Sequence, residues 1–141
     1  MLHVGPPCAP LSVYADSPLA DSTGWVDVNK QTLQHPVYSN VFAIGDCNNC
    51  PTGKTAAKVG AEAGVLYKNI KMLMAGKSLD SHYNGYTSCP LPVGDNKLIL
   101  AEFGYGLEIM ETFPFVNQAK VSVLRRGEDG HNGNVWTVII W

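Results

Sequence analysis

Val41-Phe42-Ala43-Ile44-Gly45-Asp46 is the stretch on which the expected fold depends. Four apolar residues of strand-forming character precede a Gly-Asp pair, and an Ala-rich run follows over residues 55–75. A buried strand, a tight turn and a helix in this order are typical of α/β nucleotide-binding proteins. Ligands in such folds sit beyond the carboxyl end of the strand, where the next helix begins. The sequence therefore predicts a ligand site at Asp46, whose carboxylate can accept hydrogen bonds from sugar or polyol hydroxyls.

The composition is that of one globular domain. The 141 residues are 45% hydrophobic and 16% charged, and their net charge is −2. This balance argues against nucleic-acid binding, which calls for a basic stripe. No apolar run approaches the roughly 20 residues that a membrane-spanning helix needs, and we expect no targeting segment in this chain. The four cysteines, at positions 8, 47, 50 and 89, are too few and too unevenly spaced for a secreted disulfide framework, which favours a reducing compartment.

The Ala-rich run is expected to form a helix from Thr55 to Ala75. Gly76 is suited to end it, and Lys71 lies where the helix dipole favours a positive charge. Small residues along the run leave one face that can lie close to a sheet or to a flat ligand. Apolar residues recur at helical spacing, at positions 56, 59, 63, 66, 70 and 73.

Strand signals flank this helix on both sides. Residues 25–28 alternate between apolar and polar side chains and predict a short edge strand. Residues 86–103 contain two extended runs around a turn at residues 94–96, which predicts a β-hairpin. A third short strand is expected within residues 108–115.

Residues 51–55, Pro-Thr-Gly-Lys-Thr, end like a phosphate-binding loop. The full pattern needs a glycine five positions before Gly53, where this chain has Asn48. Without that glycine the loop cannot wrap closely around a phosphate, so we exclude a nucleoside triphosphatase. Lys54 remains either a cation for an anionic ligand atom or a solvated surface lysine.

Three of the cysteines raise the question of metal or thiol chemistry. Cys47 and Cys50 have the spacing of zinc half-sites and of redox dithiols, but no second pair at ligand spacing accompanies them, which favours ordinary turn residues and no metal. Cys89 is followed by Pro90, which restricts the backbone. It is either a nucleophile held in place or a buried core thiol, and the residues alone leave both open.

The sequence holds five separated blocks in a recognisable order: Trp25-Val26-Asp27-Val28, Val41-Phe42-Ala43-Ile44-Gly45-Asp46-Cys47, Pro51-Thr52-Gly53-Lys54-Thr55-Ala56-Ala57, Tyr86-Thr87-Ser88-Cys89-Pro90-Leu91 and Ile99-Leu100-Ala101-Glu102-Phe103, continued by Glu111-Thr112-Phe113-Pro114-Phe115. Together they resemble the C-terminal part of the mitochondrial-type sulfide:quinone oxidoreductases, over roughly residues 1–115. The fold that this implies is α/β, a partial FAD/NAD(P)-binding fold of the flavoproteins with two dinucleotide-binding domains, with a C-terminal β-hairpin region. Residues 116–141 do not resemble the family and are interpreted as a divergent tail of a truncated product.

The resemblance implies a flavoenzyme of the inner mitochondrial membrane. It assigns FAD contacts to Gly45, to Asp46 at the ribityl chain, and to Lys54. It assigns the cysteine persulfide, formed from hydrogen sulfide, to Cys89. Electrons would pass through FAD to ubiquinone, and glutathione or sulfite would accept the sulfur.

Two features of the family are missing from this sequence, the Gly-x-Gly-x-x-Gly turn and the first of the two redox cysteines, the other being matched by Cys89. We therefore expect the chain to be inactive alone. The alternatives are a non-catalytic remnant or binding module without flavin, and a small metal-binding protein.

Overall fold

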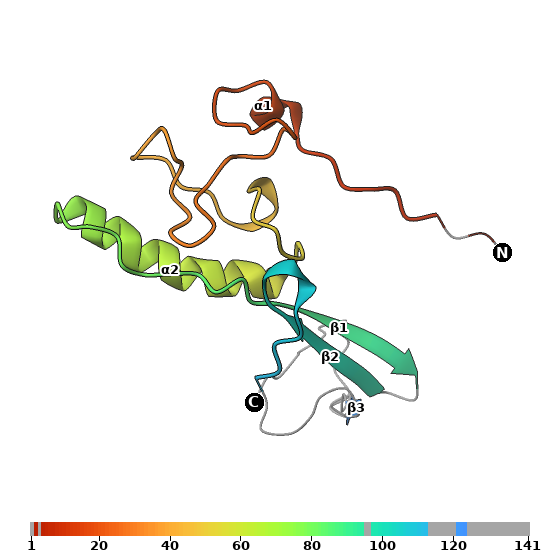
Figure 1. Ribbon diagram of the computed structural model, residues 1–141. Coiled ribbons are helices and arrows are strands. Elements are labelled where there is room, and N and C mark those ends of the chain that lie inside the picture. The colour runs from red at the N-terminus through yellow and green to blue at the C-terminus, as the bar shows by residue number, and fades with distance from the viewer. Residues whose placement is uncertain (1, 3, 95–96, 113–120, 124–141) are drawn as a thin grey trace, which may run out of the picture.

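The computed structural model describes residues 2, 4–94, 97–112 and 121–123. Helix α2 crosses the molecule, with the loop-rich N-terminal part on one side and a hairpin beyond its N-terminal end (Figure 1). The last three residues of the segment in which the third strand was expected, and most of the expected divergent tail, lie outside the described residues. The elements in chain order are α1 (Ser12–Ala15), η1 (Gly45–Cys47), α2 (Ala56–Met74), β1 (Thr87–Gly94), β2 (Lys97–Phe103), η2 (Tyr105–Leu107) and β3 (Val121–Val123).

The predicted helix is confirmed as α2, and both of its ends have a local cause. Thr55 caps the first turn, because its side-chain oxygen accepts a hydrogen bond from the Lys58 amide. At the other end Gly76 has a φ of 66°, the left-handed conformation that glycine adopts without a Cβ penalty. The amide of Lys77 then donates to the carbonyl of Met72 at 2.9 Å, which completes a Schellman motif.

The buried face of α2 differs from the apolar face expected from the sequence. The buried residues of this helix are polar: Lys58, Glu62 and Asn69. Val59 and Ile70, two of the expected apolar positions, are 36% and 38% exposed. Asn69 faces inward because it has partners there, donating to the carbonyls of Thr32 and Ser81 at 3.0 and 2.9 Å. Hydrophobic periodicity identified the helix but not the face that it buries in this chain.

Residues 41–44 do not form the strand of a sheet that the sequence predicted. They are extended, and their one bridge joins Phe42 to Gln34. Ala43 is buried, while its three neighbours in the segment are half-buried. The expected edge strand at residues 25–28 is likewise reduced to isolated bridges from Val26 to Ala20 and Asn48. Among the described residues no parallel sheet forms around these segments; they pack instead on a small core of Val26, Val28, Leu33, Ala43, Cys50 and Tyr83.

The predicted hairpin is confirmed as β1 and β2, which pair antiparallel with Thr87 opposite Phe103. Pro90 and Pro92 are compatible with β1 because it is the edge strand in the order β1-β2-β3. In the third predicted strand, the described residues 108–112 contain only an isolated bridge, from Ile109 to Phe103. No helix in the described part of the chain is both long and apolar enough to cross a bilayer.

Candidate functional site

The turn that follows residues 41–44 is η1, and its first residue has to be a glycine. Gly45 has a φ of 75°, and a Cβ built there would lie 3.2 Å from Cγ2 of Val59. Its backbone is also fully engaged, since its amide donates to Glu62 and its carbonyl accepts from Lys58. Asp46 follows on the surface of the turn, where its side chain is exposed. The turn thus buries the glycine and presents the carboxylate.

Lys54 lies beside this turn, on the loop before α2. Its ammonium donates to the carbonyl of Asp46 and, at 3.3 Å, to that of Asn48. The same ammonium stands 3.5 Å from the centre of the Trp25 ring, a cation–π contact. Desolvation, and secondarily the charge of Lys58, lower the pKa of Lys54 below the ordinary lysine value. The structure therefore brings together Gly45, Asp46 and Lys54, the three predicted cofactor contacts.

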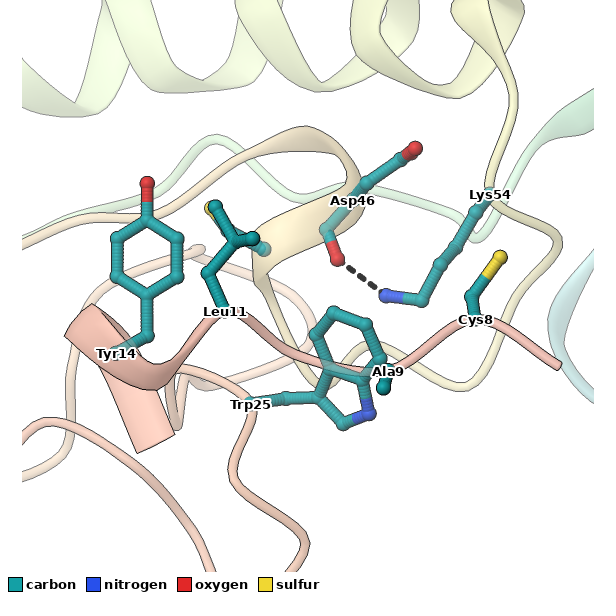
Figure 2. Close-up of a pocket in the computed structure, with 8 residues that line it drawn as sticks. Cys8, Ala9, Leu11, Tyr14, Trp25, Asp46 and Lys54 are labelled. Atoms are coloured by element: carbon teal, nitrogen blue, oxygen red, sulfur yellow. Dashed lines mark hydrogen bonds between the residues drawn. The ribbon is translucent and has the colours of Figure 1, made fainter. Parts of the chain in front are cut away.

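A cleft of about 360 Å³ opens between this turn and the N-terminal segment. Figure 2 shows Lys54 extended toward Asp46 over the Trp25 ring, with Cys8 beside the lysine. Lys54 and Trp25 give the cleft an ammonium and an aromatic face, which recognise anions and flat rings. The Asp46 carboxylate, a group that recognises hydroxyls, points away from the Lys54 ammonium and the Trp25 ring (Figure 2). Its lining residues are Cys8, Ala9, Leu11, Tyr14, Trp25, Asp46, Cys47 and Lys54.

Cys89 does not line this cleft. Thr87, two residues earlier on β1, hydrogen-bonds to the loop that carries Lys54. The Thr87 hydroxyl donates to the carbonyl of Gly53 at 3.1 Å and lies 2.8 Å from the Thr55 hydroxyl oxygen. Residues i and i+2 of a strand share a face, about 7 Å apart. Cys89 is therefore on the same face of β1 as Thr87, and it is exposed. The alternative of a buried core thiol is wrong for Cys89.

The other cysteines differ in their surroundings. Cys47 is half-buried and its thiol donates to the carbonyl of Ile44 at 3.2 Å. Cys50 is buried in the core, and desolvation raises its thiol pKa to about 11. Among the described residues no group of three or more His, Cys, Asp or Glu side chains could hold a metal ion.

The cysteine thiols should be alkylated at different rates in the folded chain. At pH 8 alkylation with iodoacetamide is expected to modify Cys8 and Cys89, which are exposed, well before Cys50. The thiolate is the nucleophile, and a pKa of about 11 leaves on the order of one Cys50 thiol in a thousand ionised at that pH. The rate at Cys50 should then rise about tenfold for each pH unit up to its pKa. Peptide mapping after timed quenching measures each rate, and urea-unfolded chain is the control, in which all four thiols should react alike.

Sequence reasoning missed part of this site. Trp25 was predicted within an edge strand and was given no ligand role, yet it lines the cleft. Cys8, Ala9, Leu11 and Tyr14 line it as well, and the sequence had pointed to none of them as a site residue. The pair Lys58 and Glu62 was missed as well, because charges four residues apart on a helix ordinarily pair on its solvated face. A lysine and a glutamate among small residues at this spacing were the available signal.

Comparisons with known proteins identify relatives of this chain. No family model matches it. The chain is 55% identical over 115 residues to the mouse protein named "Sulfide:quinone oxidoreductase, mitochondrial", and 50% identical over 123 residues to the Dictyostelium discoideum protein of the same name. These matches cover 82% and 86% of this chain but only 26% and 27% of the two relatives.

A solved structure also matches. One chain in the cryo-EM structure of the Tetrahymena thermophila mitochondrial ATP synthase superposes with a TM-score of 0.70 and 29% identity. That match covers 79% of this chain and 27% of the other, so this arrangement of elements also occurs within a larger protein. Over more than four fifths of its length the present chain is similar to a segment of the mitochondrial sulfide:quinone oxidoreductases, and it spans about a quarter of the length of those that it matches.

Proposed function

We propose that this chain supplies part of the FAD site and the persulfide-bearing cysteine of a mitochondrial sulfide:quinone oxidoreductase. The observation that carries the proposal is the cleft in which Asp46, Lys54 and Trp25 converge, together with the tie between β1 and the Lys54 loop. Relatives with the matching name support the choice of family. Quinone reduction by sulfide, and a mitochondrial location at the inner membrane, are part of the same proposal.

The residues of the cleft fit an FAD in chemical type. The exposed Asp46 carboxylate is an acceptor for the hydroxyls of the ribityl chain. The Lys54 ammonium, held over Trp25 by two backbone carbonyls, supplies a positive charge to an anionic edge of the cofactor. The Gly45 amide already donates to Glu62, so it is not free to donate to the cofactor. Gly45 therefore contributes to the site through its left-handed backbone and its lack of a side chain.

Cys89 has the exposure that sulfur transfer requires. We place it in a disulfide with a second cysteine, which hydrosulfide attacks at the Cys89 sulfur. A new S–S bond forms on Cys89, the old one breaks, and its electron pair leaves on the second cysteine as a thiolate. A thiol such as glutathione, or sulfite, would then take the sulfane sulfur and leave Cys89 as a thiolate. Bound FAD would accept the two electrons released when the two cysteines re-form their disulfide, and would pass them to ubiquinone.

Flavin binding by the chain itself tests the cofactor part of this proposal. FAD is titrated against the protein and its fluorescence is followed. Asp46→Asn is expected to raise the Kd about tenfold or more, because hydrogen bonds to a charged acceptor are worth about 1.5–3 kcal/mol. Asp80→Asn removes another exposed carboxylate, outside the cleft, and is the matched control. Equal affinities for the Asp46 and Asp80 variants would contradict the assignment.

The same titration over pH examines Lys54. The neutral form of a lysine with a lowered pKa is populated at lower pH than usual, and only the protonated form attracts an anion. FAD affinity should therefore be full below the pKa of Lys54 and fall as pH rises through it, starting below the ordinary lysine range. Lys54→Met should bind more weakly and lose this pH dependence.

A non-catalytic binding module without flavin is the competing function. The exposed positions on α2, such as Val59, Tyr67 and Met74, would suit protein contacts. A colourless chain that shows no saturable FAD binding would favour this alternative over the proposal.

A further inference from the structure

Three buried polar side chains underneath η1 form a hydrogen-bonded network, which we call the turn clamp: Asn48, Lys58 and Glu62. All three are 0% exposed. Lys58 and Glu62 lie one helical turn apart on α2, with Nζ and Oε1 separated by 3.7 Å. Every buried side-chain nitrogen or oxygen in the described part of the chain has a hydrogen-bond partner.

The clamp holds both backbone polar groups of Gly45. Oε2 of Glu62 accepts from the Gly45 amide at 2.6 Å, and Nζ of Lys58 donates to the Gly45 carbonyl at 3.2 Å. The amide and the carbonyl of Gly45, the residue directly before Asp46, are therefore each hydrogen-bonded to a side chain of opposite charge. Asn48 links them, because its amide nitrogen donates to Glu62 at 2.9 Å and its amide oxygen accepts from Lys58 at 2.7 Å.

Stability by itself does not account for such a pair. Burying an ammonium and a carboxylate carries a desolvation cost that often exceeds their attraction, and apolar replacements of the pair are often neutral or stabilising. A buried ion pair does provide a fixed geometry, because each charge has few alternative partners. Here the geometry is that of a turn whose first residue has a φ of 75° and whose second residue lines the cleft.

We infer that the turn clamp is a positioning device of the flavin site: Lys58 and Glu62 hold the Gly45 backbone so that Asp46 is presented to the cofactor. The inference rests on the proposed FAD site and adds residues that do not touch the ligand. Lys58 also contributes to the electrostatics of the cleft, since its charge helps to lower the pKa of Lys54.

The test uses the full 141-residue chain and the double variant Lys58→Met/Glu62→Gln, which removes both charges at similar volume. A purely structural role predicts that melting temperature and FAD affinity change together. The positioning role predicts a melting temperature equal to or above that of the unmodified chain, with a Kd for FAD about tenfold higher or more, because the Gly45 carbonyl has lost its charged donor. A stable double variant with unchanged affinity would overturn the inference.

Lys68→Met is the matched control, because Lys68 is an exposed lysine on the same helix. It should leave the melting temperature, and FAD affinity to within twofold, unchanged. The single variant Glu62→Gln, which leaves the Lys58 charge buried without its partner, should lose both melting temperature and affinity. If Glu62→Gln instead matched the unmodified chain in both, the charge of Glu62 would have no positioning role.

Amide hydrogen exchange provides a readout that needs no flavin. The Gly45 amide should exchange nearly as slowly as the central amides of α2, although it lies in a short turn, and at least tenfold faster in the double variant. If the unmodified chain bound no FAD, the proposed function would fail while this measurement still decided whether the clamp holds the turn. If the Gly45 amide of the unmodified chain exchanged at ordinary loop rates, the inference that the clamp holds the turn would be wrong. This result needs only the unmodified chain, so it decides the question even if the double variant does not fold.

Discussion

A chimera in which this chain replaces the matching segment of the mouse sulfide:quinone oxidoreductase is expected to reduce quinone with sulfide, and Cys89→Ala in it to lose at least about a thousandfold in rate. The magnitude follows from removing the residue that carries the covalent intermediate, which in other enzymes costs on the order of 10³–10⁶ in kcat. A methyl group cannot carry a persulfide, so neither binding nor electrostatics can compensate. The matching segment is defined by the 115 residues of the comparison. The assay follows the decrease in quinone absorbance after sulfide is added.

Leu91→Ala is the control for this experiment. Leu91 is 46% exposed on the same strand, two residues beyond Cys89 and therefore on the same face. It should retain activity within about twofold, since exposed substitutions change stability by about 0.5 kcal/mol or less. Wild-type activity in the Cys89→Ala chimera would remove Cys89 from the chemistry. An unmutated chimera that binds flavin yet transfers no electrons would contradict the proposed function of the whole chain.

Gly85→Ala is expected to destabilise the chain far more than Gly76→Ala, although both glycines have a positive φ. A Cβ at Gly85 would come within 2.6 Å of the Tyr105 ring and 2.7 Å of its backbone nitrogen, whereas a Cβ at Gly76 would meet nothing within 4 Å. The left-handed backbone costs an alanine about 1–2 kcal/mol at either site. Overpacking adds about 1–3 kcal/mol at Gly85 alone.

The clash matters because Tyr105 connects η2 to the core. Its ring packs edge-on against Tyr83, with 5.8 Å between centroids, and its hydroxyl donates to the carbonyls of Lys30 and Tyr83. Displacing it should lower the urea midpoint in a chemical unfolding experiment, with the Gly76 variant losing less than half as much. Equal midpoints for the two variants would show that the contact at Gly85 relaxes without cost.

Local sequence signals were sufficient for the elements that depend on neighbouring residues. The cap at Thr55, the stop at Gly76 and the paired runs that became β1 and β2 each require groups only a few positions apart. The strand expected at residues 41–44 failed because a strand needs partners from elsewhere. Within the described residues this segment forms one β-bridge, from Phe42 to Gln34, and no neighbouring strand pairs with it.

Part of the candidate site could likewise be predicted from the local sequence, and part of it depended on the tertiary structure. From the sequence alone it was possible to determine that a glycine and a carboxylate end an extended segment, that a helix follows after a short loop, and that a lysine stands at the helix start. The burial of Lys58 and Glu62, and the convergence of Trp25 with Lys54, were decided by tertiary structure. A charged pair on a helix is solvated unless other segments cover it, and here the Gly45 backbone and Asn48, 17 and 14 positions from Glu62, supply the hydrogen bonds that make burial possible.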